Sequence, residues 1–385
     1  MVPKLQKNDV YPRLLNLNRL LKMKSHFLFG ARSTGKTTLI QNTVKKTRIY
    51  DLLDDDVYQR LLRNPKAIGE GVITPDEVIV IDEVQRLPKL LNEVQRLMKS
   101  IPNKFLLTGS SARKLKQGGA NLLGGRAWET HLHPLCSFEI PDFDLIKYLN
   151  RGGLPHIYAS EWYERELKNY ILLYLRQEIL AEALTRNLEY FVSFLDTLAL
   201  ANGEELHFQN ISNDSGVPAR TIQNYVEVLN DTLLCFTLTS FQTKIRKSIT
   251  RSKFFFFDLG VVNSLAQRSE IKPGSELFGK AFEHFIVREI ATLVSYSDKP
   301  LPLKYWRSTS LFEVDLIIGK KWALEIKATK SVHSKHLKGL KAFQEEGLVQ
   351  KYAVISQDPE RRVIDGIEIW PWQEFLAQLN SELKL

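Results

Sequence analysis

The sequence predicts an α/β protein of several domains, and three observations support this fold class. The chain has 385 residues, which is more than one ordinary domain holds. Two apolar runs, at 26–29 and 77–83, lead into glycine or acidic residues, as buried parallel strands often do. Two further apolar runs, at 313–318 and 322–327, predict a second sheet.

The composition is that of a soluble globular protein, with 44% hydrophobic and 25% charged residues. We find no run of about 18 apolar residues and no apolar signal core, so no membrane contact is expected. Cys136 and Cys235 lie far apart without metal-ligand spacing, which suits a reduced, cytoplasmic protein. The formal net charge of +9 favours polyanionic partners such as nucleic acid, although many cytoplasmic proteins are basic for no specific reason.

The first apolar run, His26–Phe29, leads into Gly30–Thr37, which fits the pattern G-x-x-x-x-G-K-[ST] and precedes a helical start. The glycines let the backbone wrap closely, so that its amides and the helix N-terminus face phosphate groups. The pattern therefore predicts an ATP site, in which Lys36 reaches the β- and γ-phosphates and the Thr37 hydroxyl ligates Mg²⁺. The predicted nucleotide-binding residues of this segment are Gly30, Ala31, Arg32, Ser33, Thr34, Gly35, Lys36, Thr37 and Thr38.

The second apolar run, Glu77–Glu83, is typical of a parallel strand covered on both faces. Asp82 at its carboxyl end is predicted to hold the magnesium through water, and Glu83 to polarise the attacking water as a catalytic residue. A buried strand ending in a solvated acidic turn would look the same. The phosphate-binding pattern upstream favours the catalytic interpretation.

A third apolar run, Lys104–Ser111, ends in hydroxyl side chains. Thr108 or Ser110 is predicted to sense the γ-phosphate, and spacing does not choose between them. Arg126 is favoured over Arg113 as an arginine finger that acts on a neighbouring copy of the chain, which would imply a homo-oligomer. Either arginine could equally be a surface residue.

The middle of the chain, Glu161–Asn202, has apolar residues at helical spacing. This pattern predicts a helical lid over the nucleotide, and a helical linker without a chemical role fits equally well. The residues that mark the face of one helix are Leu167, Tyr170, Ile171, Tyr174 and Leu175.

Residues 206–260 predict a winged helix-turn-helix. A short helix from Phe208 reaches the turn at Gly216–Pro218, and the second helix has an apolar inner face. Two strands follow, at 233–238 and 253–257, with a basic segment between them. The predicted DNA contacts are Arg220, Thr221, Gln223 and Asn224 at the start of the second helix, and Lys244, Arg246, Lys247 and Arg251 in the basic segment. A winged helix used only for packing against protein is the alternative.

The strands 313–318 and 322–327 are joined by the three-residue loop Gly319–Lys321. A hairpin closed by this loop puts Asp315 opposite Glu325, with β-carbons about 5 Å apart, and the two carboxylates then repel unless a cation lies between them. Lys327 projects from the same face as Glu325. This is the D…E-x-K arrangement of metal-dependent nucleases, in which Asp315 and Glu325 ligate Mg²⁺ and Lys327 activates water. Glu283, on the preceding helix, is the predicted auxiliary acid.

Over nearly its whole length the chain resembles the prokaryotic AAA+-type ATPases whose C-terminal half is the domain of unknown function DUF4143. The resemblance implies a P-loop ATPase core, a winged helix and a nuclease-like fold, without one settled biological role. Many relatives have an Arg-Asp pair where this chain has Gln177-Glu178, so a nucleotide-sensing role for that arginine does not carry over directly, and the neighbouring Arg176 is the alternative. The stretches that carry the resemblance are Phe27–Thr38, Val78–Gln85, Leu106–Ser111, Gly152–Pro155, Asn210–Leu234, Phe254–Val262, Phe278–Glu289 and Tyr305–Lys327.

The sequence thus predicts four parts: a three-layer αβα P-loop ATPase core at 1–145, a helical lid at 146–202, a winged helix-turn-helix at 203–270 and a restriction-endonuclease-like α/β domain at 271–385. One hypothesis is an ATP-hydrolysing, DNA-binding protein whose C-terminal domain cuts DNA with a metal. The other is an ATP-dependent regulatory switch in which the nuclease-like domain is an inactive scaffold.

Overall fold

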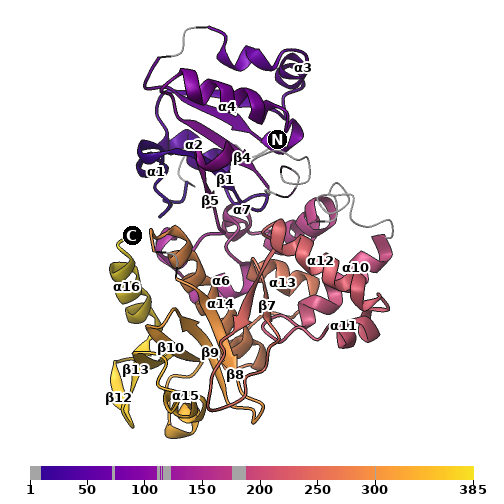
Figure 1. Ribbon diagram of the computed structural model, residues 1–385. Coiled ribbons are helices and arrows are strands. Elements are labelled where there is room, and N and C mark those ends of the chain that lie inside the picture. The colour runs from indigo at the N-terminus through magenta and orange to yellow at the C-terminus, as the bar shows by residue number, and fades with distance from the viewer. Residues whose placement is uncertain are drawn as a thin grey trace. The chain divides into compact units, whose positions relative to one another are not determined.

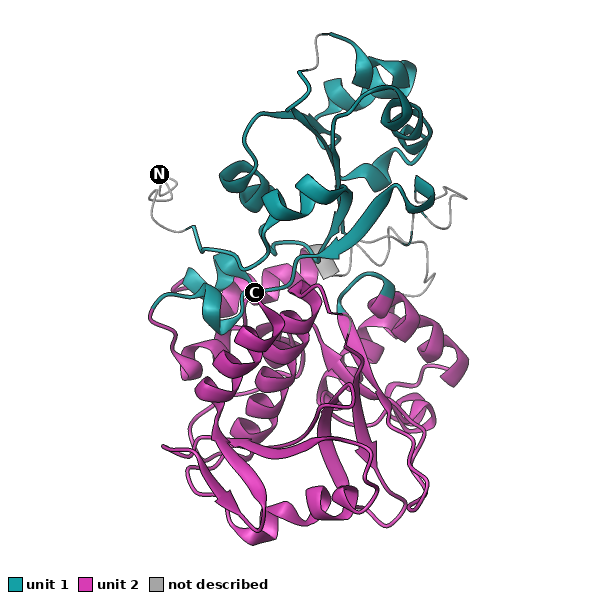
Figure 2. Cartoon of the chain, turned by 60° about the vertical axis from the view of Figure 1, so that its left-hand side comes forward, with its two compact units in different colours: residues 1–141, 154–159, 231–234 teal, residues 142–153, 160–230, 235–385 magenta. Residues whose placement is uncertain are grey.

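The computed structural model describes residues 10–71, 74–110, 113, 115, 123–175, 188–299 and 301–385 (Figure 1). The chain forms two compact units, which Figure 2 distinguishes by colour. Unit 1 comprises residues 1–141, 154–159 and 231–234, and unit 2 comprises residues 142–153, 160–230 and 235–385. Within the described residues, no helix is both long enough and apolar enough to span a bilayer.

Unit 1 is built on a five-stranded parallel sheet with the order β2-β3-β4-β1-β5. Strand β1 lies between β4 and β5, so the loop that leaves its carboxyl end emerges near the middle of the sheet. The three apolar runs of the sequence form β1, β3 and β4, whose residues are almost all buried, whereas most residues of β2 and β5 are half-buried or exposed. The strands are β1 (Ser25–Phe29), β2 (Thr47–Asp51), β3 (Val78–Asp82), β4 (Phe105–Gly109) and β5 (Ala127–His131).

The helices of unit 1 pack their apolar faces on this sheet. A core of buried side chains joins α3 and α4 to β1, β3 and β4, with Phe27 and Phe29 stacked at 5.5 Å between ring centroids. Asp54 caps α3 by accepting hydrogen bonds from the amides of Asp56 and Val57. The helices are α1 (Leu17–Met23), α2 (Lys36–Thr43), α3 (Asp55–Arg63), α4 (Leu90–Ser100) and α7 (Pro155–Ala159), with short 3₁₀ helices η1 (Pro65–Gly69), η2 (Val84–Arg86), η3 (Leu123–Gly125) and η4 (Ser137–Glu139).

Unit 2 contains an eight-stranded mixed sheet with the order β12-β13-β11-β10-β9-β8-β6-β7. Neighbouring residues of β10 pack on different helices: Trp322 contacts Phe375 of α16, and Ala323 joins the cluster beneath α15. This is expected for a strand covered on both faces. The strands are β6 (Cys235–Ser240), β7 (Lys253–Phe256), β8 (Leu303–Arg307), β9 (Glu313–Ile318), β10 (Trp322–Lys327), β11 (Lys351–Ser356), β12 (Arg362–Ile364) and β13 (Ile367–Pro371).

In unit 2 the helices α6, α13 and α16 pack against the long helix α14, whose residues are mostly buried. Phe285 of α14 contacts Tyr148 of α6 and Trp372 of α16. The predicted Gln177-Glu178 departure lies outside the described residues. The helices are α6 (Leu145–Arg151), α8 (Tyr163–Asn169), the π-helix η5 (Tyr170–Leu175), α10 (Leu188–Leu200), α11 (Phe208–Ser215), α12 (Ala219–Asp231), α13 (Leu259–Leu265), α14 (Glu276–Tyr296), the 3₁₀ helix η6 (Ser334–Leu337), α15 (Lys338–Gln344) and α16 (Trp372–Leu383).

One sheet crosses the predicted domain boundary between residues 270 and 271. Strand β6 pairs in antiparallel fashion with β7 and in parallel with β8, at Thr239–Lys304 and Ser240–Tyr305. The segment between β6 and β7 follows β8 further, because Ile249 donates its amide to the carbonyl of Arg307 at 2.8 Å. The strands predicted for a winged helix therefore belong to the same sheet as the strands predicted for a nuclease-like domain.

The segment Gly152–Gly153 fits tightly against the start of α13. Asp258, which is buried, accepts hydrogen bonds from the amides of Gly153 at 2.7 Å and Val261 at 3.1 Å. Gly152 has φ of 75°, and a β-carbon there would lie 2.2 Å from a carboxylate oxygen of Asp258. Only glycine fits this position without moving the buried carboxylate.

Replacing Gly152 with alanine should destabilise unit 2 by on the order of 2 kcal/mol, because it combines backbone strain with a clash against Asp258. Gly279→Ala in α14 is the matched control, since nothing lies within 4 Å of the added methyl group. That change should stabilise the helix by about 0.5–1 kcal/mol. Thermal melts of the two variants should shift in opposite directions, and a Gly152→Ala melt at or above the wild-type temperature would contradict the packing described here.

Candidate functional site

The loop between β1 and α2 encloses the ammonium of Lys36. Gly35 caps α2 in the left-handed conformation, with φ of 91°, and Lys36 begins the helix. The Lys36 ammonium is buried and donates to the carbonyls of Gly30 at 2.7 Å and Ala31 at 3.3 Å. Thr34 is buried and also donates to Ala31, at 2.8 Å. The predicted loop thus wraps around the ammonium of Lys36, which its backbone carbonyls contact.

The remaining predicted loop residues lie nearer the solvent. Arg32 is half-buried, and Ser33, Thr37 and Thr38 are exposed. The Thr37 hydroxyl donates to a carboxylate oxygen of Asp82 at 3.3 Å, so the helix start and the end of β3 meet. Oxygen atoms from both elements are therefore available on one side of the loop.

Asp82 is the centre of a network that joins β3, β4 and the start of α2. Its second carboxylate oxygen accepts a hydrogen bond from the hydroxyl of Thr108 on β4. The same hydroxyl accepts the amide of Glu83 at 3.1 Å. The structure thus brings Thr108, rather than Ser110, into direct contact with Asp82 and with the backbone of the predicted catalytic glutamate.

Glu83 follows β3 in a left-handed conformation, with φ of 56°, which is uncommon for a residue other than glycine. The amide group of Gln85 donates to the Glu83 carboxylate and lies 3.4 Å from the Ser110 hydroxyl. Gln85 therefore fixes the direction of the Glu83 side chain and links it to the end of β4. The sequence reasoning did not single out Gln85.

A cavity of about 550 Å³ lies beside the loop, within unit 1. Arg13 forms part of its wall and is nearly buried, donating to the carbonyls of Thr34 at 2.7 Å and His133 at 2.5 Å and pairing with Glu139 at 3.0 Å. The cavity is mostly apolar and adjoins the phosphate-binding turn, as a nucleoside site would. Its other lining residues include Val10, Tyr11, Thr38, Leu39, Leu135 and Pro155.

Arg126 does not join this site. It is exposed and immediately precedes β5, whose first residue, Ala127, pairs with Ser25 at the start of β1. The loop leaves the other end of β1, about 16 Å away along a five-residue strand. Arg126 therefore cannot contact a nucleotide in its own chain, and action on a neighbouring copy stays a prediction. Arg113 pairs with Asp231.

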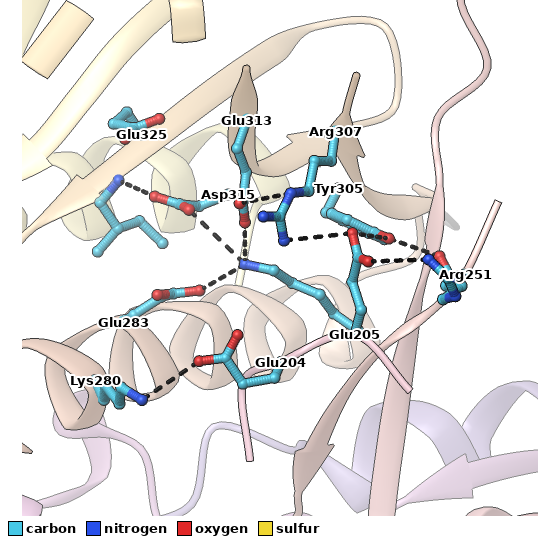
Figure 3. Close-up of polar contacts among 12 residues, drawn as sticks. Glu204, Glu205, Arg251, Lys280, Glu283, Tyr305, Arg307, Glu313, Asp315 and Glu325 are labelled. Carbon is cyan, nitrogen blue, oxygen red and sulfur yellow. Dashed lines mark hydrogen bonds and ion pairs between the residues drawn. The ribbon is translucent and has the colours of Figure 1, made fainter. Parts of the chain in front are cut away.

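A second cluster of ionisable groups lies in unit 2, between α14, β7 and β9 (Figure 3). The ammonium of Lys253 is 2.5 Å from a carboxylate oxygen of Glu313, 3.1 Å from Glu283 and 3.9 Å from Asp315. Only 5% of the Lys253 side chain is exposed. Figure 3 shows the three carboxylates converging on this one cation.

The hairpin β9–β10 has the expected register, with Leu316 opposite Leu324. Asp315 then turns its second carboxylate oxygen to the amide of Ile326, at 2.7 Å. Glu325 pairs with Lys327 at 2.6 Å, as expected for side chains on one face. The structure thus brings together all the residues of the predicted D…E-x-K pattern, with a lysine among them that the pattern does not contain.

The charges of this cluster depend on one another. Burial disfavours the ammonium of Lys253, but Glu283, Asp315 and Glu313 outweigh burial and raise its pKa well above the usual value. Burial raises the pKa of Glu283 to about 7, and the charge of Lys253 opposes this rise. Burial and the neighbouring Asp315 also raise the pKa of Glu325 well above its usual range.

The predicted DNA-contact residues are only partly free. Arg220 and Asn224 are exposed at the start of α12, and Thr221 and Gln223 are half-buried beside them, while Ile222 and Tyr225 point into the core. Lys244 and Lys247 are exposed. These residues lie on two separate elements of unit 2, a helix and the segment between β6 and β7.

The segment between β6 and β7 is not a free wing. The carboxylate of Glu346 accepts the amides of Lys244, Ile245 and Arg246 at 2.8–3.2 Å. The Arg246 guanidinium pairs with Glu345 at 2.5 Å and donates to the carbonyl of Ala342. Arg251, 49% exposed, lies 3.8 Å from Glu205. The predicted contact of Arg246 with DNA stays a prediction, and in this structure its guanidinium already has protein partners beside α15.

Comparison with known protein families identifies a domain in the N-terminal part of the chain and another in the C-terminal part. Residues 22–140 match the family model of the AAA domain, and residues 278–375 match the domain of unknown function DUF4143. The chain thus combines an AAA domain with a C-terminal DUF4143 domain. This confirms the family that the sequence resembles. Residues 142–272 match a further domain of unknown function, DUF8612.

Two solved structures show a distant likeness to the chain. One is the ORC1 protein of Aeropyrum pernix in complex with DNA, with 14% identity over 67% of this chain and 93% of that chain, at a TM-score of 0.26. The other is Can2 from Sulfobacillus thermosulfidooxidans in complex with cyclic tetra-adenylate, with 9% identity over 95% and 99%, at a TM-score of 0.20. With TM-scores this low, neither likeness identifies a function. No curated protein matches the sequence significantly.

The AAA domain offers a donor set that suits Mg²⁺. The Thr37 hydroxyl and the Asp82 carboxylate lie 3.3 Å apart, and both are hard oxygen donors. The DUF4143 domain does not fit a metal in the same way, because the Lys253 ammonium lies 3.9 Å from Asp315, one of the two predicted metal ligands, and pairs with the neighbouring Glu283 and Glu313. Among the described residues, no group of three or more His, Cys, Asp or Glu side chains is arranged to hold a metal ion. The predicted Mg²⁺ site at Asp315 and Glu325 is therefore replaced by an ion-pair cluster.

Sequence reasoning placed Lys253 at the start of a strand, counted it among the basic residues of the predicted wing, and gave it no part in the D…E-x-K site. One signal was present, since Lys253 begins an aromatic run, Phe254–Phe257, that had been predicted to be buried. A lysine in a buried strand requires acidic partners. Arg13 and Glu205 had no comparable signal, because their partners are distant in sequence.

The raised pKa of Glu283 predicts that the DUF4143 domain loses stability as the pH rises from about 4.5 to about 7. The sign follows because Glu283 keeps its proton to a higher pH in the folded state than in the unfolded state. Glu283→Gln should flatten this part of the pH profile of the melting temperature by a few degrees. Glu276→Gln, an exposed change on the same helix, is the control and should leave the profile unchanged. A Glu283→Gln profile parallel to the wild type would show that Glu283 does not titrate in this window.

Proposed function

We propose that the AAA domain binds and hydrolyses ATP with Mg²⁺ at the loop Gly30–Thr37. The observation that carries the proposal is the shared Asp82 carboxylate, which joins Thr37 of the loop to Thr108 of β4. The match of residues 22–140 to the AAA domain supports the same function. The adjoining cavity has the size and lining expected for a nucleoside.

Each residue has a defined role in this proposal. The Lys36 ammonium donates hydrogen bonds to loop carbonyls in this structure, and it would donate to phosphate oxygens when ATP is bound. Thr37 and Asp82 would hold Mg²⁺, which neutralises phosphate charge when bound. Glu83 would orient the attacking water, with Gln85 holding its carboxylate. Thr108 would couple the magnesium side of the site to the Glu83 backbone.

Two substitutions separate binding from hydrolysis. Lys36→Ala should abolish detectable ATP binding, because it removes the cation of the loop. Glu83→Gln should keep ATP binding and lower the hydrolysis rate on the order of 100-fold or more, because the general base is lost. Equilibrium binding of a fluorescent ATP analogue and release of phosphate measure the two steps.

Lys45→Ala removes an exposed lysine beyond the end of α2 and should change neither measurement. Full phosphate release by Glu83→Gln would remove Glu83 from its proposed role. Unchanged nucleotide binding by Lys36→Ala would contradict the site as a whole.

DNA binding through α12 is a second candidate function. The start of α12 exposes Arg220 and Asn224, while the opposite face of the helix packs into the core through Ile222 and Tyr225. A helix that is anchored on one face and polar on the other can enter a groove of DNA. The formal net charge of +9 favours association with a polyanion.

Arg220→Ala should weaken DNA binding about tenfold and lower the salt dependence of binding by about one ion. Lys384→Ala, which removes an exposed charge near the C-terminus, should leave both unchanged. Fluorescence anisotropy with labelled duplex DNA at several salt concentrations measures both quantities. Equal affinities for wild type and Arg220→Ala would exclude α12 as the DNA-binding surface.

The regulatory alternative differs in what ATP controls. In that case the nucleotide state changes contacts with protein partners, and DNA neither binds the chain nor alters ATP turnover. The occupied cluster at Lys253 favours a DUF4143 domain that acts as a scaffold in either case. Metal-dependent cutting by Asp315, Glu325 and Lys327 therefore has no part in the proposed function.

A further inference from the structure

We infer that the ammonium of Lys253 is a built-in substitute for a divalent cation, and that its removal creates a metal site in the DUF4143 domain. The D…E-x-K pattern places carboxylates close together, and such a group is stable only with positive charge between them. Lys253 supplies that charge from a strand outside the pattern, at 2.5 Å from Glu313 and 3.1 Å from Glu283.

The position of Lys253 is fixed by its backbone as well as by its side chain. Lys253 pairs with Leu238 of β6 on one side and forms a bridge to Glu205 on the other. The amide of Phe254 donates to the carbonyl of Glu204 at 3.0 Å. The lysine thus enters the cluster from a strand paired on both edges, rather than from a mobile loop.

The surroundings of the ammonium are those of a small cation site. The side chain passes under Tyr305, with the ammonium 5.7 Å from the ring centroid. The guanidinium of Arg307 lies 3.7 Å from the carboxylate of Glu313, so Glu313 contacts two positively charged side chains, those of Lys253 and Arg307. The ammonium and the Asp315 carboxylate are buried, while Glu283 and Glu313 are 24% and 28% exposed.

One oxygen of the cluster has no partner even with Lys253 in place. The Oε2 atom of Glu325 is buried and accepts no hydrogen bond, although Lys327 pairs with the other oxygen of the same carboxylate. Without the ammonium, Glu283 and the Oδ1 atom of Asp315 would lose their cation, and Glu313 would keep only Arg307. An all-oxygen set of this kind is what Mn²⁺ and Mg²⁺ prefer.

The experiment compares Mn²⁺ binding by the nucleotide-free full-length chain and its variants, following the electron paramagnetic resonance signal of free Mn²⁺. Wild type and Asp315→Asn should bind the same number of ions, because the cluster takes none. Lys253→Met should bind one more ion than the double variant Lys253→Met/Asp315→Asn. Lys253→Arg, which keeps a cation at this position, is the matched control and should behave as wild type.

A thermal melt supplies a second readout. Lys253→Met should melt at a lower temperature than wild type, and Mn²⁺ should raise its melting temperature while leaving that of the wild type unchanged. Ions bound at the loop Gly30–Thr37 cancel in the comparison, because every variant retains that site.

Two outcomes would overturn the inference. One is a wild-type chain that binds an Mn²⁺ ion absent from Asp315→Asn, since the cluster would then hold a metal beside Lys253. The other is a folded Lys253→Met that gains no ion. If Lys253→Met does not fold, the comparison of wild type with Asp315→Asn decides by itself.

Discussion

Carboxylates that are buried close together require a positive charge beside them. In unit 2 Lys253 supplies this charge. The residue begins β7, far in sequence from Glu313 and Asp315 on β9, so the ion pairs form only when the whole sheet has assembled. Leaving the partners buried without this ammonium would be strongly destabilising. The position of β7, and with it β6, therefore depends on charge as much as on apolar packing.

Unit 1 follows a different rule, because its polar groups gather where parallel strands end. Strands β1, β3 and β4 are neighbours in the sheet, and each ends in a polar segment. Asp82 can consequently touch both Thr37 and Thr108, whose elements are well separated in sequence. The arrangement keeps the apolar strands uninterrupted, and the chemistry lies in the loops at one edge.

The sequence allowed β1, β3 and β4 of unit 1, the phosphate-binding loop and the β9–β10 register to be predicted, because each depends on local periodicity or a short pattern. It did not reveal Gln85 as the partner of Glu83, since nothing in its spacing distinguishes it from a surface glutamine. The sequence did not reveal the partners of Arg246, because a basic segment without acidic residues can still meet acids from elsewhere in the chain, here Glu345 and Glu346. Local sequence patterns do not show which side chains pair when they lie far apart in the sequence.

The parallel pairing of β6 with β8 has a consequence for how this protein can be divided. A fragment ending at residue 270 would leave one edge of β6 unpaired, and a fragment starting at residue 271 would leave β8 in the same condition. Exposed strand edges recruit other strands and promote aggregation. Two different family models match residues 142–272 and 278–375. These two parts of the chain share one sheet, so they are not independent domains. Gene fusion or loss at this junction would have to replace a sheet edge as well as a linker.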